Sequence, residues 1–129
     1  MVEHSEGSKT LYDLDLENTE NVSRNYIALN SNNQPVPIFC RHCDQPECVA
    51  ACISGAMKKD NITGLVTYDK EQCASCYMCV MSCPYSVLKA DNNTKKVIIK
   101  CDFCKDNTSP RCVESCPNKA IYLIEVNAV

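Results

Sequence analysis

The cysteines of this chain are the residues whose spacing points most directly to chemistry. Twelve of the 129 residues are cysteine, a share typical of chains held together by disulfides or by metal. The densest run is Cys73-x2-Cys76-x2-Cys79-x3-Cys83, which Pro84 follows. In this spacing three thiolates bind one cubane [4Fe–4S] cluster and the fourth binds a neighbouring cluster. The run therefore predicts a pair of iron–sulfur clusters.

Two further cysteine runs keep the two ends of this spacing and lengthen its middle. They are Cys40-x2-Cys43-x4-Cys48-x3-Cys52 and Cys101-x2-Cys104-x7-Cys112-x3-Cys116. A longer loop still lets thiolates converge, and the final Cys-x3-Cys, which sets the ligand of the other cluster, is unchanged in both. Ile53 stands where Pro84 and Pro117 follow the other two runs.

Crossover ligation assigns ligands to two clusters. One cluster takes three cysteines of the first run and the last of the second: Cys40, Cys43, Cys48 and Cys83. The other takes three cysteines of the second run and the last of the first: Cys73, Cys76, Cys79 and Cys52. This exchange of fourth ligands predicts two [4Fe–4S] clusters near each other, as electron hopping requires.

The third run has no partner within the chain. Under the same rule, Cys101, Cys104 and Cys112 lack a fourth cysteine, and Cys116 points to a cluster whose other ligands are absent. Either all four cysteines close on one cluster, or another chain or a missing segment completes the site. The sequence is therefore compatible with either two clusters or three.

Disulfides and structural zinc are the alternative explanations of these cysteines. No secretory signal begins the chain, and repeated Cys-x2-Cys pairs favour metal over disulfides. Zinc also binds such pairs, but it does not explain three evenly spaced cysteines followed by Cys-Pro. A zinc-binding or redox-sensing interaction module is therefore kept as the alternative function. We expect His42 to pack beside a cluster or donate a hydrogen bond to sulfur rather than to bind metal.

Three internal repeats must position the cysteines. Each contains Cys-Val-x-Ala/Ser-Cys, with two apolar residues four and five positions later. We expect each repeat to form a cysteine-rich loop, a short helix with both cysteines on one face, and a short strand. Hairpins are predicted over residues 56–68 and 87–99, with turns at 60–64 and 91–94.

The expected fold is α+β, a bacterial dicluster ferredoxin-like core with the third four-cysteine motif packed against it. This domain spans residues 40–129, with motifs at 40–52, 73–83 and 101–116. Residues 1–39 contain no cysteine and carry six acidic against two basic side chains. We expect them to form an arm, with an apolar stretch at 26–29 and a loop at 30–35.

Composition excludes several other functions. The net charge is −3 and no basic cluster marks a nucleic-acid interface. No run of 18 apolar residues predicts a membrane span. The sequence shows no nucleophile–base pair and no glycine-rich nucleotide loop, so we expect no catalytic site. Reduced thiols and the lack of a secretory signal predict a cytoplasmic protein.

The three motifs, in this order, resemble the polyferredoxin-like subunits of multi-component anaerobic oxidoreductases. These include the electron-transfer subunits of dimethyl sulfoxide reductase-type enzymes, formate dehydrogenases and hydrogenases. Four segments look most similar to the iron–sulfur subunit of anaerobic carbon monoxide dehydrogenases: residues 40–43, 51–56, 63–66 and 100–104. The resemblance, which covers residues 36–124, implies a small subunit that relays electrons between a catalytic subunit and a second acceptor.

One departure from that family concerns its first motif. The family usually has four motifs and four clusters, and its first motif pairs with its last. Here the first is missing, while His4-Ser5 and Ser8-Lys9 look like residues that follow it in relatives. We therefore expect the chain to start just after that motif, which puts the third cluster in doubt but not the central pair.

Overall fold

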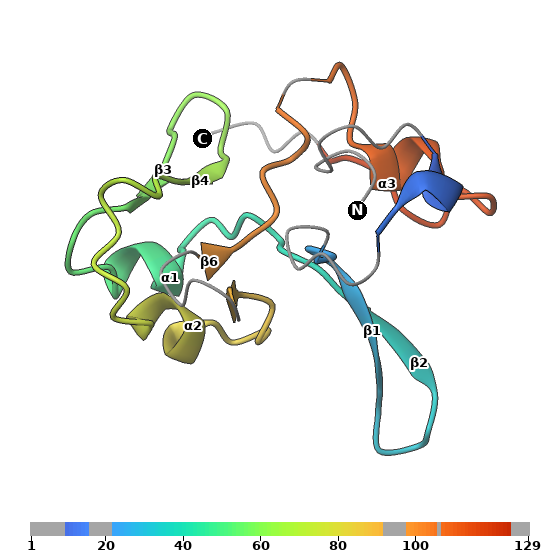
Figure 1. Cartoon of the computed structure of the whole chain (residues 1–129), viewed down its shortest axis with the longest axis horizontal. Coiled ribbons are helices and arrows are strands. Elements are labelled where there is room, and N and C mark those ends of the chain that lie inside the picture. The colour runs from blue at the N-terminus through green and yellow to red at the C-terminus, as the bar shows by residue number, and fades with distance from the viewer. Residues whose placement is uncertain (1–9, 16–21, 92–97, 106, 125–129) are drawn as a thin grey trace.

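The computed structural model describes residues 10–15, 22–91, 98–105 and 107–124. Within these residues the chain forms short helices and three separate two-stranded antiparallel sheets (Figure 1). The elements are, in chain order, η2 (Leu11–Asp13), β1 (Tyr26–Leu29), β2 (Pro35–Ile38), α1 (Glu47–Ala50), β3 (Met57–Lys59), β4 (Val66–Tyr68), α2 (Met78–Ser82), β5 (Lys89–Ala90), β6 (Ile98–Ile99) and α3 (Arg111–Glu114). Helices of four or five residues are not stable alone, so packing must hold them.

The predicted helices are present, but each is shorter than expected at its C-terminal end. They include the first cysteine of Cys-Val-x-Ala/Ser-Cys and stop before the last. Cys83, for example, follows α2 in an extended conformation, with φ −72° and ψ 114°. The prediction that both cysteines lie on one helix face was therefore wrong. The last cysteine of each motif instead begins a tight turn that follows the helix.

The first predicted hairpin is confirmed. Strands β3 and β4 pair antiparallel, with Met57 opposite Tyr68. In the turn, the Asp60 carboxylate accepts hydrogen bonds from the N–H groups of Ile62 (2.8 Å) and Thr63 (3.3 Å). Gly64 follows with φ +70°, a conformation that glycine adopts without strain.

The second hairpin is displaced along the chain. Strands β5 and β6 pair antiparallel, but β5 is Lys89–Ala90 rather than Val87-Leu88. Val87 and Leu88 are instead buried in the core, where they pack with Met57, Cys79 and Ile98. Residues 92–97, which hold most of the predicted turn, lie outside the described part. After α3, no strand forms in the described residues up to 124.

Strands β1 and β2 form a hairpin that extends away from the helices (Figure 1). Its base is attached to the rest of the chain through Tyr26. The Tyr26 hydroxyl donates to the carbonyl of Ser86 (2.8 Å), and the Lys89 ammonium lies 3.9 Å from the centre of the Tyr26 ring. Arg24 forms an ion pair with Asp102 at 2.6 Å. The predicted domain division at residue 39 stays a prediction.

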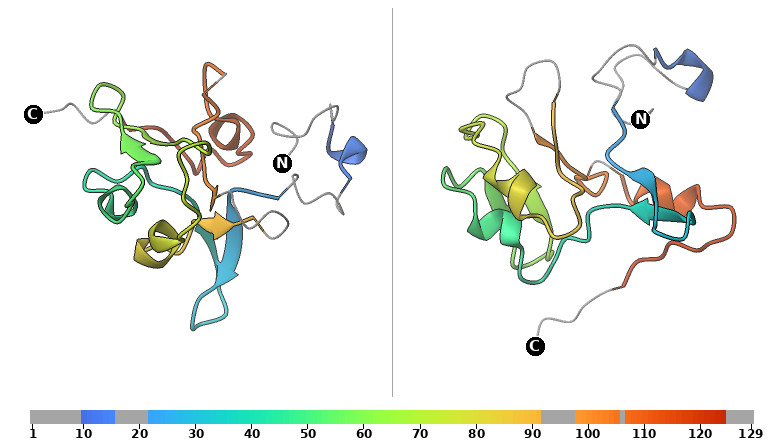
Figure 2. Two further views of the ribbon diagram at one scale, coloured as in Figure 1. Left: turned by 60° about the vertical axis from the view of Figure 1, so that its left-hand side comes forward. Right: turned by 90° about the horizontal axis from the view of Figure 1, so that it is seen from below.

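The core lies where α1 packs against α2 and β3 (Figure 2). Its buried cluster consists of Met57, Cys79, Val87, Leu88 and Ile98. Met57 comes from β3, Cys79 from α2 and Ile98 from β6, while Val87 and Leu88 directly precede β5. The core therefore joins the first two repeats. No helix in the described part of the chain has the length and apolar character needed to cross a membrane.

Candidate iron–sulfur centre

Cysteines of the first two motifs surround the core. Six of them pack against it as partly buried or buried side chains: Cys40, Cys48, Cys52, Cys73, Cys79 and Cys83. None of the third motif's cysteines belongs to this described cluster. The fold therefore brings the first and second motifs together, as crossover ligation requires.

The cysteines predicted to hold the first cluster line a single cavity. They are Cys40, Cys43, Cys48 and Cys83, and we call this set the first cluster site. Burial raises the pKa of the Cys48 thiol, and the neighbouring Cys40, Cys83 and Cys43 raise it further. Crowded thiols resist losing several protons together, and a bound cationic iron centre would relieve that repulsion.

The cysteines predicted to hold the second cluster are Cys52, Cys73, Cys76 and Cys79, and we call this set the second cluster site. Burial raises the pKa of Cys79 to about 11, with Cys52 the next contributor and Cys73 a smaller one. Cys79 is buried, whereas Cys76 is exposed. The site therefore has one side in the core and one side at the surface.

The Cys-x2-Cys loops share an unusual backbone conformation. In the first Cys-x2-Cys loop of each motif the residue before the second cysteine is left-handed: His42, Ser75 and Phe103 have φ of 46°, 54° and 65°. This conformation turns the backbone N–H toward the first cysteine. Ser75 N–H donates to the Cys73 sulfur and Phe103 N–H to the Cys101 sulfur, each at 3.4 Å. Successive N–H groups of this kind form anion-binding concavities known at Fe–S sites.

A second turn recurs after the last cysteine of each motif. The residue three positions later is left-handed (Gly55, Ser86, Lys119), and its N–H donates to the carbonyl of that cysteine at 3.1–3.2 Å. In the first and third motifs the turn also places an N–H on sulfur. Met57 donates to the Cys52 sulfur (3.4 Å), and Ala120 donates to the Cys116 sulfur (3.2 Å).

These hydrogen bonds favour the thiolate form. The bonds from Ala120 and then Ile121 hold the pKa of Cys116 below its ordinary value. Burial alone would raise the pKa of Cys52, but the hydrogen bonds from Met57 and Ser54 outweigh it, so that pKa is also lowered. A lowered pKa supplies the deprotonated sulfur that a metal ligand requires.

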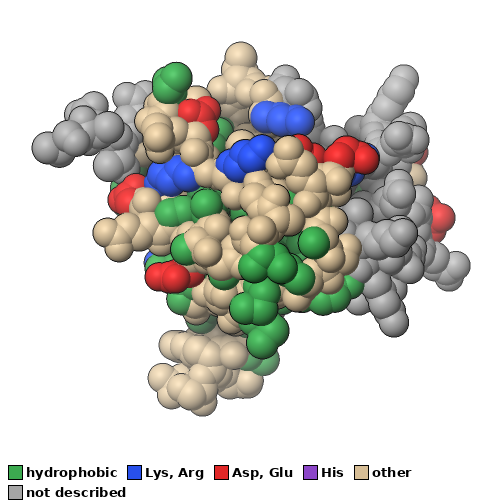
Figure 3. All heavy atoms as spheres, turned by 90° about the vertical axis from the view of Figure 1, so that its left-hand side faces the viewer, with side chains coloured by type: hydrophobic (Ala, Val, Ile, Leu, Met, Phe, Trp, Pro, Cys, Tyr) green, Lys and Arg blue, Asp and Glu red, His purple; other side chains and the backbone are tan. Residues whose placement is uncertain are grey.

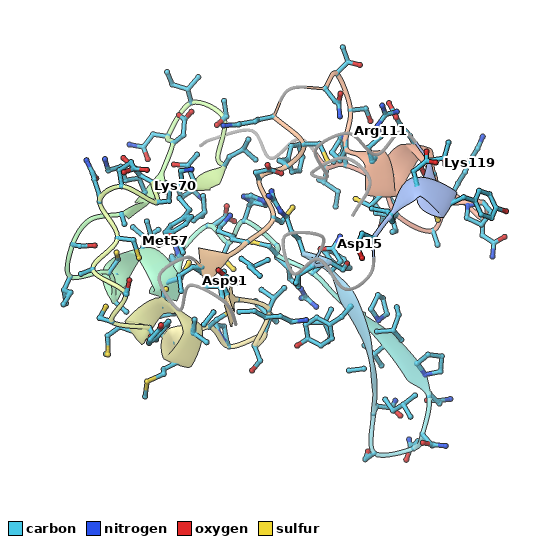
Figure 4. The ribbon with its side chains drawn as sticks, viewed as in Figure 1. Asp15, Met57, Lys70, Asp91, Arg111 and Lys119 are labelled. Carbon is cyan, nitrogen blue, oxygen red and sulfur yellow. The ribbon has the colours of Figure 1, made fainter. Side chains whose placement is uncertain are left out.

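The third motif is only partly joined to the other two. Burial raises the pKa of Cys101, the Phe103 hydrogen bond opposes this, and Cys40 is near enough to raise it again. The ring of Phe103 meets His42 edge-on, with ring centres 5.5 Å apart. Arg111, the first residue of α3, and Lys119, which follows the helix, lie at the opposite end of the molecule from Met57 (Figure 4). The last two cysteines of the motif, Cys112 and Cys116, are therefore distant from the core.

His42 is held between these loops. Its Nδ1 accepts a hydrogen bond from Val66 N–H at 3.0 Å, while its buried Nε2 has no partner among the described residues. Burial, followed by the charge of Lys100, lowers the pKa of His42 to about 4. A neutral ring that accepts at Nδ1 carries its proton on Nε2, so His42 has a buried donor in the wall of the first cluster site.

Sequence reasoning missed two lysines at these sites. Lys59 donates to the carbonyl of Cys43 (2.7 Å), and Lys100 donates to the carbonyl of Cys101 (2.8 Å). From the sequence alone, a lysine beside a cysteine motif is expected to lie at the surface. Only the fold shows that Lys100, at 6% exposure, is the most buried charged side chain of the described residues.

The donor set fits iron–sulfur clusters. All twelve cysteines lie in described residues and are free thiols, so no disulfide scaffold forms. Thiolates with backbone N–H donors are the ligands of Fe–S clusters. In the described residues, no three His, Cys, Asp or Glu side chains meet around one point as ligands of a single metal ion do.

Comparison with known proteins identifies relatives of this chain. Residues 32–126 match the model of the 4Fe-4S dicluster domain family. The chain is 42% identical over 91 residues to the hydrogenase-2 operon protein HybA of Escherichia coli O157:H7, covering 64% of this chain and 28% of HybA. It is 43% identical over 88 residues to the B subunit of anaerobic dimethyl sulfoxide reductase of Escherichia coli K12, covering 65% and 42%.

A third relative is the NrfC homolog of Haemophilus influenzae. The chain is 38% identical to it over 103 residues, which cover 74% of this chain and 45% of that protein. The chain thus spans less than half the length of these curated relatives.

Proposed function

Because the chain belongs to the 4Fe-4S dicluster domain family, we propose that it relays single electrons between a catalytic oxidoreductase subunit and a second acceptor. The family indicates two [4Fe–4S] clusters, and each accepts and releases one electron at a time when bound. Electron transfer is also the function supported by relatives such as the B subunit of dimethyl sulfoxide reductase. The observation that carries the proposal is the meeting of the first two motifs around one core.

The ligand sets follow the crossover rule in this proposal. The first cluster site is supported by the shared cavity and by the mutual effects of its thiols. The second is supported by the nearness of Cys52 and Cys73 to Cys79. Fourth ligands exchanged between motifs would keep the clusters at a distance suited to electron transfer.

We further propose that the third motif closes on its own cysteines or is completed by another chain. Support comes from its local backbone, which repeats the left-handed residues of the other motifs at Phe103 and Lys119 and their N–H···S bonds at Phe103 and Ala120. Its first two cysteines would stay next to the other motifs through the contact of Phe103 with His42.

The partner is proposed from the sequence. Residues 40–43 and 100–104 resemble the iron–sulfur subunit of anaerobic carbon monoxide dehydrogenases, so a catalytic subunit of that kind is our candidate. An anaerobic setting and a cytoplasmic location complete the proposal, because a reducing compartment keeps all twelve thiols available for clusters.

Iron and acid-labile sulfide per chain, measured after anaerobic purification together with the EPR spectrum of the reduced protein, test the function. About eight irons with equal sulfide would mean that the central pair forms, and about twelve that the third motif also closes a cluster. Zinc without sulfide would favour the zinc-binding module and refute electron transfer through clusters.

The partner is tested separately. The reduced, cluster-loaded chain should reoxidise when mixed with a competent acceptor protein, followed by visible absorbance. Substrate turnover by the purified chain alone would contradict a purely relaying role.

A further inference from the structure

Lys100 is a buried charge that the proposed function does not yet use. Its side chain is 6% exposed, although lysine is almost never buried without a partner. Burying an ammonium group without compensating groups around it is strongly unfavourable. The groups around the Lys100 ammonium should therefore include those that compensate its positive charge.

Two carbonyl groups fix the position of the ammonium. Lys100 Nζ donates to the carbonyl oxygen of Val66, and to that of Cys101 at 2.8 Å. Val66 is less than 2% exposed and lines the cavity formed by the first cluster site. The Val66 N–H, in turn, donates to His42. One buried residue thus anchors both polar side chains against that site.

No carboxylate reaches Lys100 within salt-bridge distance among the described residues. The nearest acidic side chain in sequence, Asp102, is in an ion pair with Arg24 at 2.6 Å. The groups that hold the ammonium are instead the two carbonyls, one from Val66 in the wall of the first cluster site and one from Cys101 of the third motif.

We propose that Lys100 is the built-in counter-charge of the first cluster site and raises the reduction potential of the cluster bound there. This inference rests on the proposed function, since it needs a cluster at Cys40, Cys43, Cys48 and Cys83. One electron from an external donor adds one unit of negative charge at the site, with no bond or proton change. A fixed ammonium stabilises that added charge more strongly in a buried, low-dielectric position than at the surface.

Two other lysines provide the contrast. Lys59 also bonds to a cysteine carbonyl, but it faces Asp44 at 3.5 Å, which offsets its charge. Lys58 is exposed on β3, where water and salt screen it. Neither should influence a cluster as Lys100 does.

The test is an EPR-monitored redox titration of the anaerobically purified full chain and four variants. Lys100→Met removes the charge at similar length, and Lys100→Gln removes the charge but keeps a donor. Lys100→Arg keeps the charge, and Lys58→Met is the matched surface control. Iron and sulfide are measured in every sample, so absence of clusters in the parent chain would signal failure of the proposed function itself.

We expect the Lys100→Met and Lys100→Gln chains to show, for one cluster, a reduced-to-oxidised ratio at least about tenfold lower at a fixed potential, or about 59 mV for a one-electron couple. Lys100→Arg and Lys58→Met should stay near the parent. In a Cys76→Ala background, which removes the second cluster, the remaining signal should show the same shift. Unchanged potentials in both neutral variants would overturn the proposal.

Cluster loss is informative as well. If both neutral variants lose only the first cluster while Lys100→Arg keeps it, the positive charge is what retains it, as proposed. If all three Lys100 variants lose both clusters equally, Lys100 serves packing and the counter-charge role is refuted.

Discussion

A thiol becomes a metal ligand when its surroundings favour loss of the proton, and this chain provides for that with backbone groups. Ser75, Phe103 and Met57 each present an N–H to a cysteine sulfur at 3.4 Å. The left-handed residues of the Cys-x2-Cys loops are not glycines, and such residues cost about 1–2 kcal/mol each. The cost is offset where sulfur receives a hydrogen bond and, in the proposed holo state, iron.

Cys76 tests the second cluster site at the scale of one residue. It is exposed, and its own loop offers no spare thiol. We expect Cys76→Ala to lose about four irons per chain, measured with sulfide after anaerobic purification. Met81→Ala, at an exposed position of α2 (79%), is the control and should keep all its iron. Unchanged iron in Cys76→Ala would contradict the assignment.

At the scale of elements, the sequence predicts the hairpins better than the helix ends. The Asp60 turn and the apolar pair around Met57 carry local signals, and β3 and β4 form as predicted. The turns after the helices do not carry such signals. Only the first has a glycine, Gly55, whereas Ser86 and Lys119 take the same left-handed conformation without a residue type that favours it.

Met57 joins an element to the core and to a ligand. It is 2% exposed in β3, packs in the buried cluster and donates to the Cys52 sulfur. We expect Met57→Ala to destabilise the chain by about 2–5 kcal/mol, because a cavity opens beside that cysteine. The measurement is the urea concentration at which half the visible cluster absorbance is lost after a fixed incubation.

Ile62→Ala is the matched control for that variant. Ile62 lies in the turn of the same hairpin and is 96% exposed, so its removal should change stability by less than about 0.5 kcal/mol. Equal sensitivity of the two variants to urea would show that the β3 contact does not support the site.

At the scale of the whole molecule, the chain has two unequal ends. One end carries α1, α2 and the core, and exposed apolar side chains gather on this face (Figure 3). Ile53 and Met81 belong to its exposed apolar residues, at 77% and 79%. The other end carries α3. Among the described elements, α3 packs less closely on its neighbours than α1 packs on α2 and β3.

This asymmetry predicts unequal effects of the last cysteines. Cys83 packs on the core beside the first cluster site, whereas Cys116 lies near α3. We expect Cys83→Ala to lose more iron than Cys116→Ala, with both measured as iron and sulfide per chain. Equal losses would show that Cys116 is a true cluster ligand in the isolated chain.

Spacing predicts that the first two motifs come together, and the structure places cysteines of both around one core; the exact ligand sets stay a prediction. It does not predict Lys100, since the burial of a lysine depends on Val66 and Cys101 coming together, and Lys100 lies 34 positions from Val66 in the sequence. Nor does it predict the Nε2 of His42 as a buried donor, which depends on the Val66 N–H binding the other ring nitrogen.

The exposure of Cys76 beside the buried Cys79 affects how stable the cluster-loaded protein is in air. If the cluster exchanges electrons with a partner protein at this exposed side, dioxygen can also reach it there and oxidise it. Among the eight cysteines assigned to the two central clusters, Cys76 is the exposed one, so we expect damage by dioxygen to these clusters to begin at its loop.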